Sequence, residues 1–330
     1  MDLFVIIGLL FVVYYSIYLI FPFFLDCDIL LAFKEKYGKP VSSLKGKTVW
    51  ITGASAGIGE QLAYVLAKAD CKLILSARRV AELERVKKKC LEENRNLTDN
   101  DVEAYSMDML DLDLHEKAFE HVINKFGKLD ILVNNAGRSQ RAKWENIEIA
   151  VDKEMFNLNV FSIMSLSRLV IKYFLKVGEG QIVTTSSLAG ILPVPMSATY
   201  CGTKHALHGY FRPLFLEYPD KHISVTMVCP GPVQTEFLAK SFTEKSGETY
   251  GVTTDVSRSK VSAERCATLM GVAIANELDE VWIATASSLR IVYLSYCFPN
   301  FAKWYMFTYR SSIIYINANF YQCRLILISI

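Results

Sequence analysis

The 330-residue sequence has no excess of charge of either sign and no closely paired cysteines. Its 36 Lys and Arg residues against 34 Asp and Glu residues give a net charge of +2, whereas a nucleic-acid-binding protein carries a strongly basic surface. The eight cysteines form no Cys-x-x-Cys pair, so we expect no zinc site or disulfide scaffold and interpret them as small buried hydrophobic residues. No repeat of about 20 to 50 residues is present, which excludes a solenoid.

Hydrophobic residues make up 52% of the chain and charged residues 21%, a composition that supports a large core and excludes a disordered polymer. The apolar residues are concentrated at the two ends of the chain. Between these ends, no Gly-, Ser- or Pro-rich linker divides the sequence. We therefore expect one domain over residues 44–290, preceded by a hydrophobic segment within residues 1–28 and followed by a hydrophobic, aromatic extension over residues 289–330.

The first apolar stretch, from Leu3 to Leu25, contains no charged residue. As an α-helix it would be about 34 Å long, which is enough to cross the hydrocarbon core of a bilayer with some tilt. A cleaved secretory signal has a basic start and a small-residue cleavage site, whereas this stretch follows Asp2 and ends in bulky residues. We expect a single-pass anchor in the endoplasmic reticulum membrane; if the segment is a cleaved signal, the alternative is a secreted protein.

Two features of the sequence disagree about the face of the membrane on which the body lies. Lysines at positions 34, 36, 39, 45 and 47 follow the anchor, and the positive-inside rule then places the body in the cytosol. The triplet Asn96-Leu97-Thr98 is a glycosylation sequon, which is used only in the lumen. The sequence leaves both faces open.

The second apolar stretch, from Leu289 to Phe307, is dense in aromatic residues and contains Arg290 and Lys303. Amphipathic segments with Trp and Tyr can lie in a membrane interface. A buried C-terminal helix that lines a lipophilic pocket would show the same pattern. Both interpretations stay open, and residues 311–330 support no prediction.

Short β-branched runs alternate with long helical patterns through the body. The predicted strands are Thr48–Thr52, Lys72–Ser76, Val102–Met107, Ile131–Val133, Gln181–Thr185, Ile223–Val228 and Val281–Ile283. The predicted helices are Glu60–Ala69, Val80–Glu93, Leu114–Phe126 and Asp152–Lys176. Strands that are apolar throughout and alternate with helices indicate a doubly wound α/β fold, with a parallel sheet covered by helices on both faces.

A glycine-rich turn directly follows the first predicted strand, and a helix begins at once. Backbone N–H groups of such a turn can approach a pyrophosphate, and the helix N-terminus favours its negative charge. The chain has no Gly-Lys-Ser/Thr, so the turn is not a P-loop for ATP. We predict cofactor contacts from Gly53, Ser55, Gly57, Ile58 and Gly59.

The end of the second strand indicates which nucleotide binds. An NAD-binding protein places an acid there, to accept hydrogen bonds from the ribose 2′-hydroxyl, but this chain has Ala77, preceded by Ser76 and followed by Arg78 and Arg79. No carboxylate repels a 2′-phosphate, and Arg can bind one bidentately, so we predict NADP(H). Further predicted cofactor contacts close the third and fourth strands: Asp108, Asn134, Asn135, Ala136 and Gly137.

Tyr200 and Lys204 are spaced i, i+4 and so lie on one helical face. A free phenol titrates near pH 10, and we expect the ammonium, with an oxidised nicotinamide close by, to lower that pKa for acid–base work. Ser187 follows a strand and could donate a hydrogen bond to a substrate oxygen. Asn159, on the long preceding helix, could hold a water that relays protons.

These motifs occur in the order of the short-chain dehydrogenase/reductases, which the chain resembles over about residues 47 to 285. The shared features are the glycine turn, Asn-Asn-Ala-Gly, Ser187, Tyr-x-x-x-Lys and the run Pro230-Gly231-Pro232-Val233-Gln234-Thr235. Through LSARRVAELERVKKKC, TKHAL and CPGPVQ it is most similar to the membrane-anchored dehydrogenase/reductase member 7 group. The resemblance ends at about residue 305.

The resemblance implies a Rossmann-type sheet and a catalytic tetrad of Asn159, Ser187, Tyr200 and Lys204, with Ser187 also touching the substrate. It implies NADP(H)-dependent oxidoreduction of a lipophilic carbonyl or alcohol, such as a steroid or retinoid. It adds cofactor contacts from Tyr200, Lys204, Pro230, Gly231, Val233 and Thr235. It also implies a homodimer formed through the helices that carry Asn159 and Tyr200.

Two other functions use the same motifs. A nucleotide-sugar epimerase can employ the same Tyr and Lys, although such enzymes usually need a larger C-terminal substrate domain. A catalytically silent NADP-binding membrane scaffold would keep only the binding residues. No metal is expected: His115 and His121 fall on a predicted surface helix, and His205 and His208 flank Lys204 without evident ligand partners.

Overall fold

The computed structural model describes residues 3–251 and 260–308, which fall into two compact units. One unit is Leu25–Thr285 and holds every residue predicted to take part in binding or catalysis. The other combines the two ends of the chain, up to Phe24 and from Ala286. Each is described by itself.

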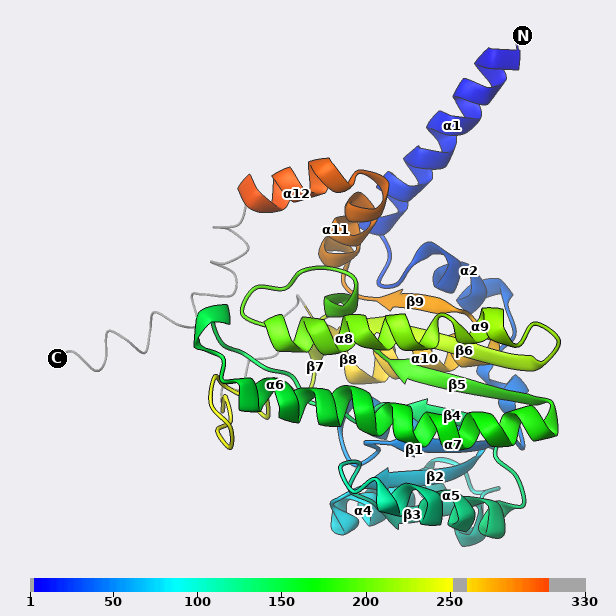
Figure 1. Cartoon of the computed structure of the whole chain (residues 1–330). Coiled ribbons are helices and arrows are strands. Elements are labelled where there is room, and N and C mark those ends of the chain that lie inside the picture. Colours follow the sequence, from blue (N-terminus) through cyan, green and yellow to red (C-terminus); the bar gives the residue numbers. More distant parts are fainter. Residues whose placement is uncertain (1–2, 252–259, 309–330) are drawn as a thin grey trace. The chain divides into compact units, whose positions relative to one another are not determined.

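The larger unit is built on a seven-stranded sheet in the order β3-β2-β1-β4-β5-β6-β9, with every neighbouring pair parallel (Figure 1). The strands are β1 Thr48–Thr52, β2 Lys72–Ala77, β3 Val102–Ser106, β4 Ile131–Asn134, β5 Glu179–Thr185, β6 His222–Pro230 and β9 Glu280–Ile283. The predicted doubly wound parallel sheet is confirmed, and each predicted strand has its counterpart. A second sheet pairs β7 Val233–Gln234 with β8 Val261–Ser262.

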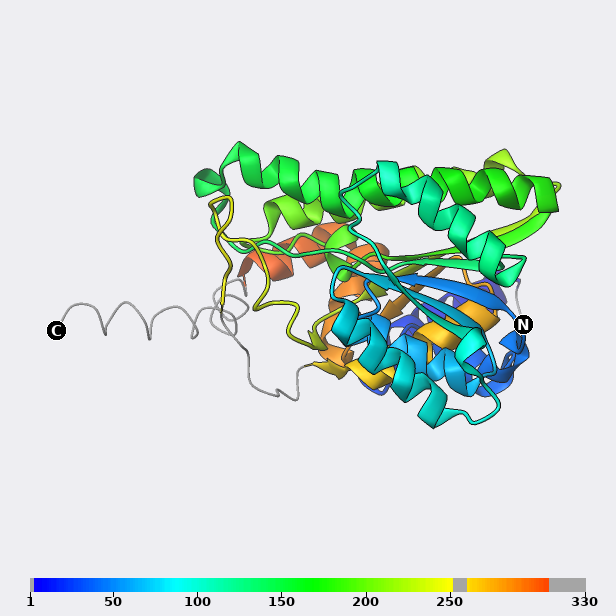
Figure 2. The same ribbon diagram turned by 90° about the horizontal axis from the view of Figure 1, so that it is seen from below.

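Alternating residues of each strand feed two separate cores, one on each face of the sheet. In β1, Val49 and Ile51 belong to one core and Trp50 to the other. Helices cover both faces (Figures 1 and 2). The first core includes side chains from α3 Gly57–Lys68, α4 Val80–Glu93 and α10 Ala263–Ala275, and the second includes side chains from α5 Asp113–Phe126, α7 Ser162–Val177 and α8 Ala198–Phe211. Because both faces are buried, the strands read as continuous apolar runs.

The helix predicted over Asp152–Lys176 is interrupted. It consists of α6 Ile149–Phe156, a π-helical turn η5 Asn157–Phe161 and α7. Single π turns inside α-helices are rare and occur often at functional sites. The remaining short elements of this unit are η2 Val41–Leu44, η3 Asp99–Asp101, η4 Trp144–Asn146, η6 Leu188–Gly190 and α9 Leu214–Glu217.

A segment that precedes residue 44 covers the outer edge strand β9. Asp28 caps helix α2 Ile29–Tyr37, and its carboxylate accepts from Leu31 N at 2.9 Å and from Trp282 N at 2.8 Å. Cys27 forms an antiparallel bridge with Ile283. Arg265 on α10 holds the same segment through ion pairs. The edge of the sheet is thereby closed against further strand pairing.

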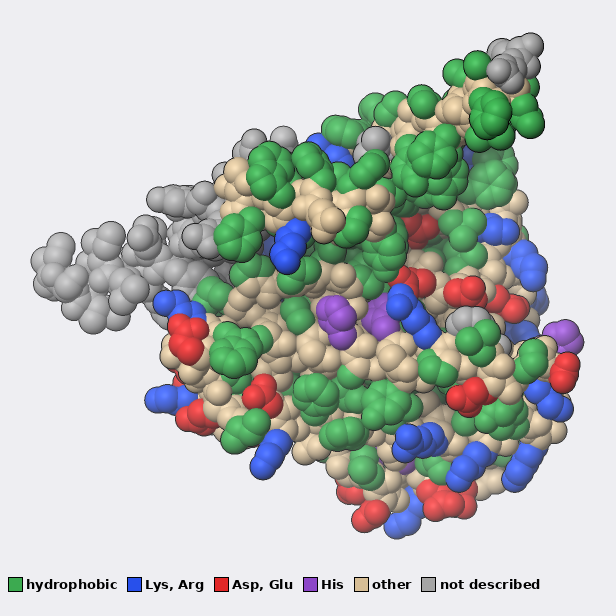
Figure 3. All heavy atoms as spheres, turned by 45° about the horizontal axis from the view of Figure 1, so that its top comes forward, with side chains coloured by type: hydrophobic (Ala, Val, Ile, Leu, Met, Phe, Trp, Pro, Cys, Tyr) green, Lys and Arg blue, Asp and Glu red, His purple; other side chains and the backbone are tan. Residues whose placement is uncertain are grey.

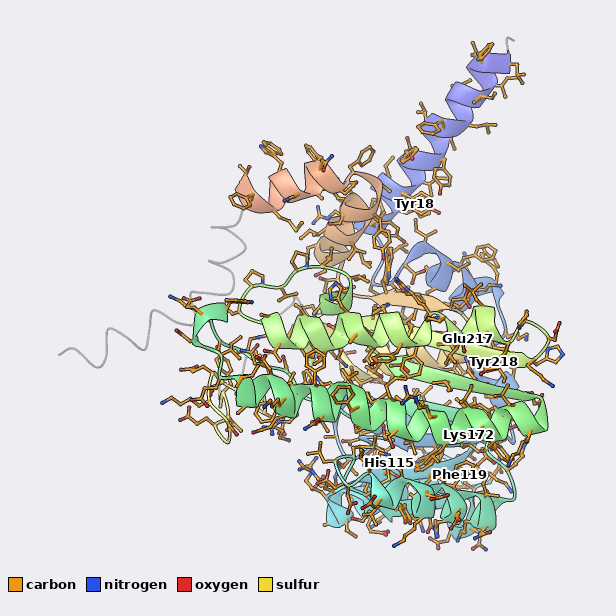
Figure 4. All side chains as sticks on the ribbon, viewed as in Figure 1. Tyr18, His115, Phe119, Lys172, Glu217 and Tyr218 are labelled. Carbon is orange, nitrogen blue, oxygen red and sulfur yellow. The ribbon has the colours of Figure 1, made fainter. Side chains whose placement is uncertain are left out.

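His115 corrects one expectation from the sequence. It lies on α5 as predicted, but on the buried face of that helix, with no exposed surface (Figure 4). Its ring nitrogens lie 3.1 Å from Ser165 Oγ on α7 and 3.1 Å from Met109 O. Burial lowers the pKa of the imidazole, so it is neutral at pH 7 and serves as a packed core residue.

The described cysteines match their interpretation in part. Five are buried (Cys27, Cys71, Cys90, Cys229 and Cys266), whereas Cys201 and Cys297 are half-buried. All seven are free thiols, and Cys323 lies outside the described residues.

The smaller unit contains the two hydrophobic ends. Helix α1 Leu3–Ile20 is followed by the 3₁₀ turn η1 Phe21–Phe23, and exposed apolar side chains gather on the face of α1 that Figure 3 shows. The predicted C-terminal stretch forms two helices, α11 Ala286–Cys297 and α12 Pro299–Thr308. Aromatic contacts join them to the N-terminal segment, including Tyr18–Tyr293 and Tyr15–Phe298. The tail over residues 311–330 lies outside the described residues.

The chain from Leu3 to Phe23 is long and apolar enough to span a membrane, and most of its described side chains are exposed. The run Ile149–Val177 meets the same length and hydropathy criteria, but half of it is buried in the larger unit, as expected for a core helix. The N-terminal helix is thus compatible with the predicted anchor.

Candidate active site

The turn between β1 and α3 is shaped by three glycines. Gly53 and Gly57 have φ angles of +67° and +62°, a left-handed conformation that favours glycine. A Cβ on Gly53 would lie 2.9 Å from Ala136 Cα, and one on Gly59 would lie 2.5 Å from Gly53 O. Ala56, the residue before α3, provides no side-chain cap for the first N–H groups of the helix. This cradle of backbone donors fits the pyrophosphate of a dinucleotide.

The two arginines after β2 have different surroundings. Arg79 donates from Nη2 to Ser55 Oγ at 3.1 Å and to Ser55 O at 3.3 Å, so it braces the glycine turn. The Arg78 side chain is 67% exposed and lies 3.8 Å from Asp108 Oδ2. Ser76 is buried and accepts from Trp50 Nε1 at 2.8 Å. Both arginines are exposed, but Arg79 is engaged with Ser55, whereas Arg78 has only the long contact with Asp108.

Asn134 to Gly137 hold the end of β4 against the glycine turn. Asn135 donates from Nδ2 to the carbonyls of Thr52 and Gly53, each at 3.2 Å. The Thr52 hydroxyl accepts from the backbone N–H of Asn135 at 3.0 Å and of Ala136 at 3.2 Å. Asn134 is buried and donates to Ser167 Oγ, which points to a packing role. This role of Thr52 was not predicted from the sequence, in which the only indication is a threonine at the end of the first strand.

The run after β6 returns to the same place. Pro230 ends β6, Gly231 N donates to Ile283 O at 2.8 Å, and Val233 begins β7. The methyl group of Thr235 would lie 3.2 Å from a Cβ on Gly57. Thr235 thus borders the glycine turn, as the cofactor prediction requires. Ile58, by contrast, packs against the core beneath the turn.

Tyr200 and Lys204 lie on α8 and are both buried. Lys204 Nζ donates to Thr185 O at 2.8 Å and lies 5.7 Å from the centre of the Tyr200 ring. Burial raises the pKa of Tyr200 to about 12, although the hydrogen bond with Ser187 acts in the opposite direction. Burial also lowers the pKa of Lys204 to about 8.

The lowered Tyr200 pKa expected from the sequence assumes an oxidised nicotinamide beside the phenol, whereas the raised pKa is that of the protein alone. Desolvation disfavours both the phenolate and the ammonium, and at Tyr200 it outweighs the opposing influence of Ser187 and of the Arg141 charge. An oxidised nicotinamide bound beside the phenol would add a positive charge that lowers the pKa.

Ser187 lies between the end of β5 and Tyr200. Its hydroxyl accepts from Ala189 N at 3.1 Å, donates to Pro230 O at 3.3 Å and shares a hydrogen bond with Tyr200. The serine is therefore oriented by backbone groups on both sides. Such a fixed hydroxyl is suited to orienting a substrate oxygen beside the phenol.

Asn159 lies in the π turn and is completely buried. Its Oδ1 accepts from Arg138 N at 2.9 Å, and its Nδ2 donates to Arg138 O at 2.8 Å and to Thr203 Oγ1 at 3.2 Å. The amide thus joins the loop after β4 to the helix that carries Tyr200. These contacts make Asn159 a link between site segments, whereas the sequence suggested a water-holding role.

An apolar cluster surrounds the phenol of Tyr200. The cluster consists of Tyr200 with Val151, Met155, Ala189 and Phe242, and Ile147, Val194 and Cys201 pack against it. The Phe237 ring centre lies 6.2 Å from that of Tyr200. The Tyr200 side chain therefore packs largely among hydrophobic residues.

Comparisons with known proteins agree with this geometry. The family model "short chain dehydrogenase" matches residues 47–246. Dehydrogenase/reductase SDR family member 7 from Homo sapiens and from Mus musculus are each 42% identical over 283 residues, which cover 84% of this chain and 82% of theirs. The 11-beta-hydroxysteroid dehydrogenase-like 2 of Arabidopsis thaliana is 34% identical over 73% of this chain and 75% of its own.

Solved structures are similar in fold. An alcohol dehydrogenase from Thermococcus sibiricus complexed with 5-hydroxy-NADP has a TM-score of 0.63 and 23% identity, and it covers 73% of this chain and 97% of its own. An actinorhodin polyketide ketoreductase with NADPH has a TM-score of 0.64 at the same identity, over 74% and 97%. These two proteins share the Rossmann-like arrangement seen here.

The buried phenol gives a first testable prediction. Tyr200→Phe should lower turnover by about 10² to 10⁴, because only the acid–base hydroxyl is lost. Binding of NADPH, followed by its fluorescence, should be almost unchanged. A variant that keeps more than half of the wild-type rate would show that Tyr200 is not the acid–base group.

Proposed function

Because the chain belongs to the short-chain dehydrogenase/reductase family, we propose that it is an NADP(H)-dependent oxidoreductase that interconverts a lipophilic carbonyl and the corresponding alcohol. The observation that carries this proposal is the hydrogen-bonded Tyr200–Ser187 pair inside an apolar cluster, on the same unit as the glycine cradle. When bound, the nicotinamide supplies or accepts the hydride.

The chain's own residues then have distinct tasks. Tyr200 holds or takes the proton at the substrate oxygen, and Ser187 orients that oxygen through its fixed hydroxyl. Lys204, anchored on Thr185 O, keeps a positive charge close to the phenol ring. The glycine turn, Asn135 and Thr235 form the surface that would hold the dinucleotide.

The preference for NADP(H) rests on the end of β2. Ala77 offers no carboxylate, and the exposed guanidinium of Arg78 is available for the two hydrogen bonds that a 2′-phosphate accepts. Asp108 is 3.8 Å from Arg78, a separation that gives only a weak pairing at this exposure. Two fold relatives were solved with 5-hydroxy-NADP and with NADPH, which supports the same cofactor class.

The hydrophobic surroundings of Tyr200 support a lipophilic substrate. The buried neighbours of Tyr200, including Val151, Met155 and Phe242, are apolar and provide few polar groups for recognising a sugar or a nucleotide. Relatives named as hydroxysteroid dehydrogenases, from Arabidopsis thaliana and Sesamum indicum, support a steroid or a molecule of similar polarity.

Purified full-length protein should oxidise NADPH in the presence of at least one member of a panel of steroids, retinal and small quinones. Loss of absorbance at 340 nm follows the reaction, and Tyr200→Phe serves as the matched inactive control. Binding of NADPH without turnover of any carbonyl in the panel would favour the silent scaffold instead.

Cofactor choice should depend on Arg78. We expect Arg78→Ala to raise the KM for NADPH while that for NADH stays nearly constant, because only the contact with the 2′-phosphate disappears. Adding Ala77→Asp should then favour NADH, since a carboxylate accepts from the 2′-hydroxyl and repels the phosphate. Steady-state kinetics with both cofactors measures the change.

Arg79→Ala is the control for this prediction, because Arg79 braces Ser55 in the glycine turn. Loss of the Arg79 side chain should weaken the binding of NADPH and of NADH to the same extent. The same equal weakening in Arg78→Ala would mean that Arg78 is structural and does not discriminate between the cofactors.

We also propose that the N-terminal helix anchors the protein in the endoplasmic reticulum membrane. The run Leu3–Phe23 is uncharged, mostly exposed over its described residues and long enough to cross the bilayer. On this proposal, the exposed aromatic residues of α12, including Phe301 and Trp304, lie in the membrane interface.

Alkaline carbonate extraction should leave the full chain in the membrane pellet, because burial and not surface charge holds a spanning helix. A chain shortened to begin at Leu25 keeps Asp28 and the segment that closes β9, so it is the informative comparison. Its release to the supernatant would make α1 the sole integral anchor. Release of the full chain would contradict the anchor and favour the cleaved signal.

The face of the membrane can be tested at Asn96, which is exposed. A mobility shift on glycosidase treatment, lost in Asn96→Gln, would place the body in the lumen. Absence of a shift agrees with the cytosolic face that the lysine bias favours.

Finally, we propose a homodimer through α7 and α8, the helices adjoining Asn159 and carrying Tyr200. Phe161, at the end of the π turn, is half exposed and adjoins a shallow surface hollow lined by Asp152, Phe156 and Asn157. Light scattering on detergent-solubilised protein should give the mass of two chains, and Phe161→Glu should shift it to one. An unchanged mass in the variant would argue against this surface.

A further inference from the structure

A buried polar cluster lies directly behind the catalytic residues. His208 follows Lys204 by one turn of α8 and is almost fully buried. Its Nε2 is 2.9 Å from Ser186 Oγ and 3.7 Å from Cys229 Sγ. Its Nδ1 is 3.3 Å from Glu280 Oε2. Three residues, Cys229 of β6, Glu280 of β9 and Ser186 directly after β5, thus meet around one imidazole of α8.

The position of this imidazole is set by its neighbours. A Cβ on Gly190 would lie 2.7 Å from Ser186 Oγ and 3.0 Å from His208 Nε2, so the backbone packs closely over the hydrogen bond. The Glu280 carboxylate accepts from Arg212 Nη2 at 2.6 Å and from Trp282 Nε1 at 2.9 Å. The imidazole of His208 therefore has Ser186 beside Nε2 and the anchored carboxylate of Glu280 beside Nδ1.

The ionisation of Glu280 bears on which nitrogen of His208 donates a hydrogen bond and which accepts one. Burial acts to raise its pKa, but the contacts with His208, Arg212 and Trp282 outweigh it and lower the pKa to about 2. An ionised carboxylate only accepts hydrogen bonds, and it faces Nδ1 at 3.3 Å, at ion-pair distance but outside hydrogen-bond geometry. The tautomer with its proton on Nδ1 therefore suits both neighbours, because it leaves Nε2 as the acceptor for the Ser186 hydroxyl, 2.9 Å away.

His208, Cys229 and Glu280 also form a group of metal-ligand types whose donor atoms lie within 4.8 Å of one another. Cys229 approaches Nε2, whereas Glu280 approaches Nδ1 on the other side of the ring. The two partners therefore face opposite nitrogens of the ring, and we interpret the contacts of His208 as a hydrogen-bonded and ion-paired cluster.

The cluster is in register with the catalytic residues. Lys204 Nζ bonds to Thr185 O, and one helical turn later His208 bonds to Ser186, the next residue of the chain. Ser187, which shares a hydrogen bond with Tyr200, comes directly after. Two successive turns of α8 are thus joined to two successive residues that lead into the catalytic serine.

We propose that His208 is a positioning residue, which holds Ser186 and thereby sets Ser187 against Tyr200. The inference rests on the proposed function, because it assigns His208 a part in that reaction. Glu280 supports the imidazole from behind and Arg212 supports Glu280. The Glu280 carboxylate, held by Arg212, thus orients the imidazole from the Nδ1 side, and Nε2 holds Ser186.

Kinetics of variants tests the proposal. His208→Leu should lower kcat by about 10- to 100-fold, the effect of misplacing a catalytic group, with the KM for NADPH within about twofold of wild type. His208→Gln should recover most of the rate, because its amide can reach Ser186 from a similar position. His205→Leu, an exposed histidine on the same helix bonded only locally to Cys201 O, should behave as wild type.

Ser186→Ala removes the same hydrogen bond and keeps the ring, so it also serves if the leucine variant fails to fold. Combined with His208→Gln, it should cause no further loss than the larger single effect. If the losses in kcat of the two single variants multiplied in the double variant, the proposal would be overturned. A wild-type kcat in Ser186→Ala would overturn it too. If the affinity for NADPH fell by the same factor as kcat, His208 would have a general structural role, and this result would also overturn the proposal.

A second measurement needs no substrate, so it separates failure of this proposal from failure of the proposed function. Full-length protein labelled with ¹⁵N-histidine, with His208→Gln to assign the signals, should show an Nδ1-protonated ring. Its Nε2 shift should move in Ser186→Ala and stay constant in His205→Leu. An Nε2-protonated ring, or no response to Ser186→Ala, would contradict the proposal even in an active enzyme.

Discussion

The active site depends on the burial of one ammonium. Lys204 Nζ is removed from water and donates to Thr185 O at the end of β5, which ties α8 to the centre of the sheet. A buried cation without a partner would be strongly unfavourable, so this contact fixes the height of the helix along the strand. The positions of Tyr200, one turn before, and of Ser187, two residues after Thr185, follow from it.

The same burial gives the site its electrostatic character. The pKa of Tyr200 is raised to about 12 and that of Lys204 is lowered to about 8, both by desolvation. Phenol and ammonium are therefore sensitive to any further charge in the site, because a low dielectric strengthens each interaction. A nicotinamide that changes charge on hydride transfer would couple proton transfer at Tyr200 to the redox state of the cofactor.

The sequence alone predicts the features that depend on short-range patterns. Short apolar runs located all seven strands of the main sheet, and fixed spacings located the glycine turn and the Tyr200–Lys204 pair. It could not predict contacts whose partners are far apart in the chain. His208 and Glu280 are separated by 72 residues, and Asp28 meets Trp282 across 254 residues.

Other misses have the same physical origin. His115 occupies a helix that the pattern predicted correctly, but which face is buried depends on Ser165 of α7. The lowered pKa expected for Tyr200 assumes a bound oxidised nicotinamide; in the protein alone burial raises it, and that burial depends on residues distant in the chain, such as Val151 and Phe242. Thr52 looks like any strand threonine until the fold brings Asn135 to its hydroxyl.

The contacts behind the site suggest why these polar residues tolerate burial. Asn159 satisfies both backbone groups of Arg138, His208 satisfies Ser186, and Thr52 satisfies two backbone N–H groups at once. Each joins two segments that meet at the carboxyl edge of a parallel sheet, where loops would otherwise leave donors and acceptors unpaired. The hydroxyls and amides that hold this edge together therefore also set the distances between the reacting groups. A substitution behind the site can for that reason alter the rate without touching substrate or cofactor.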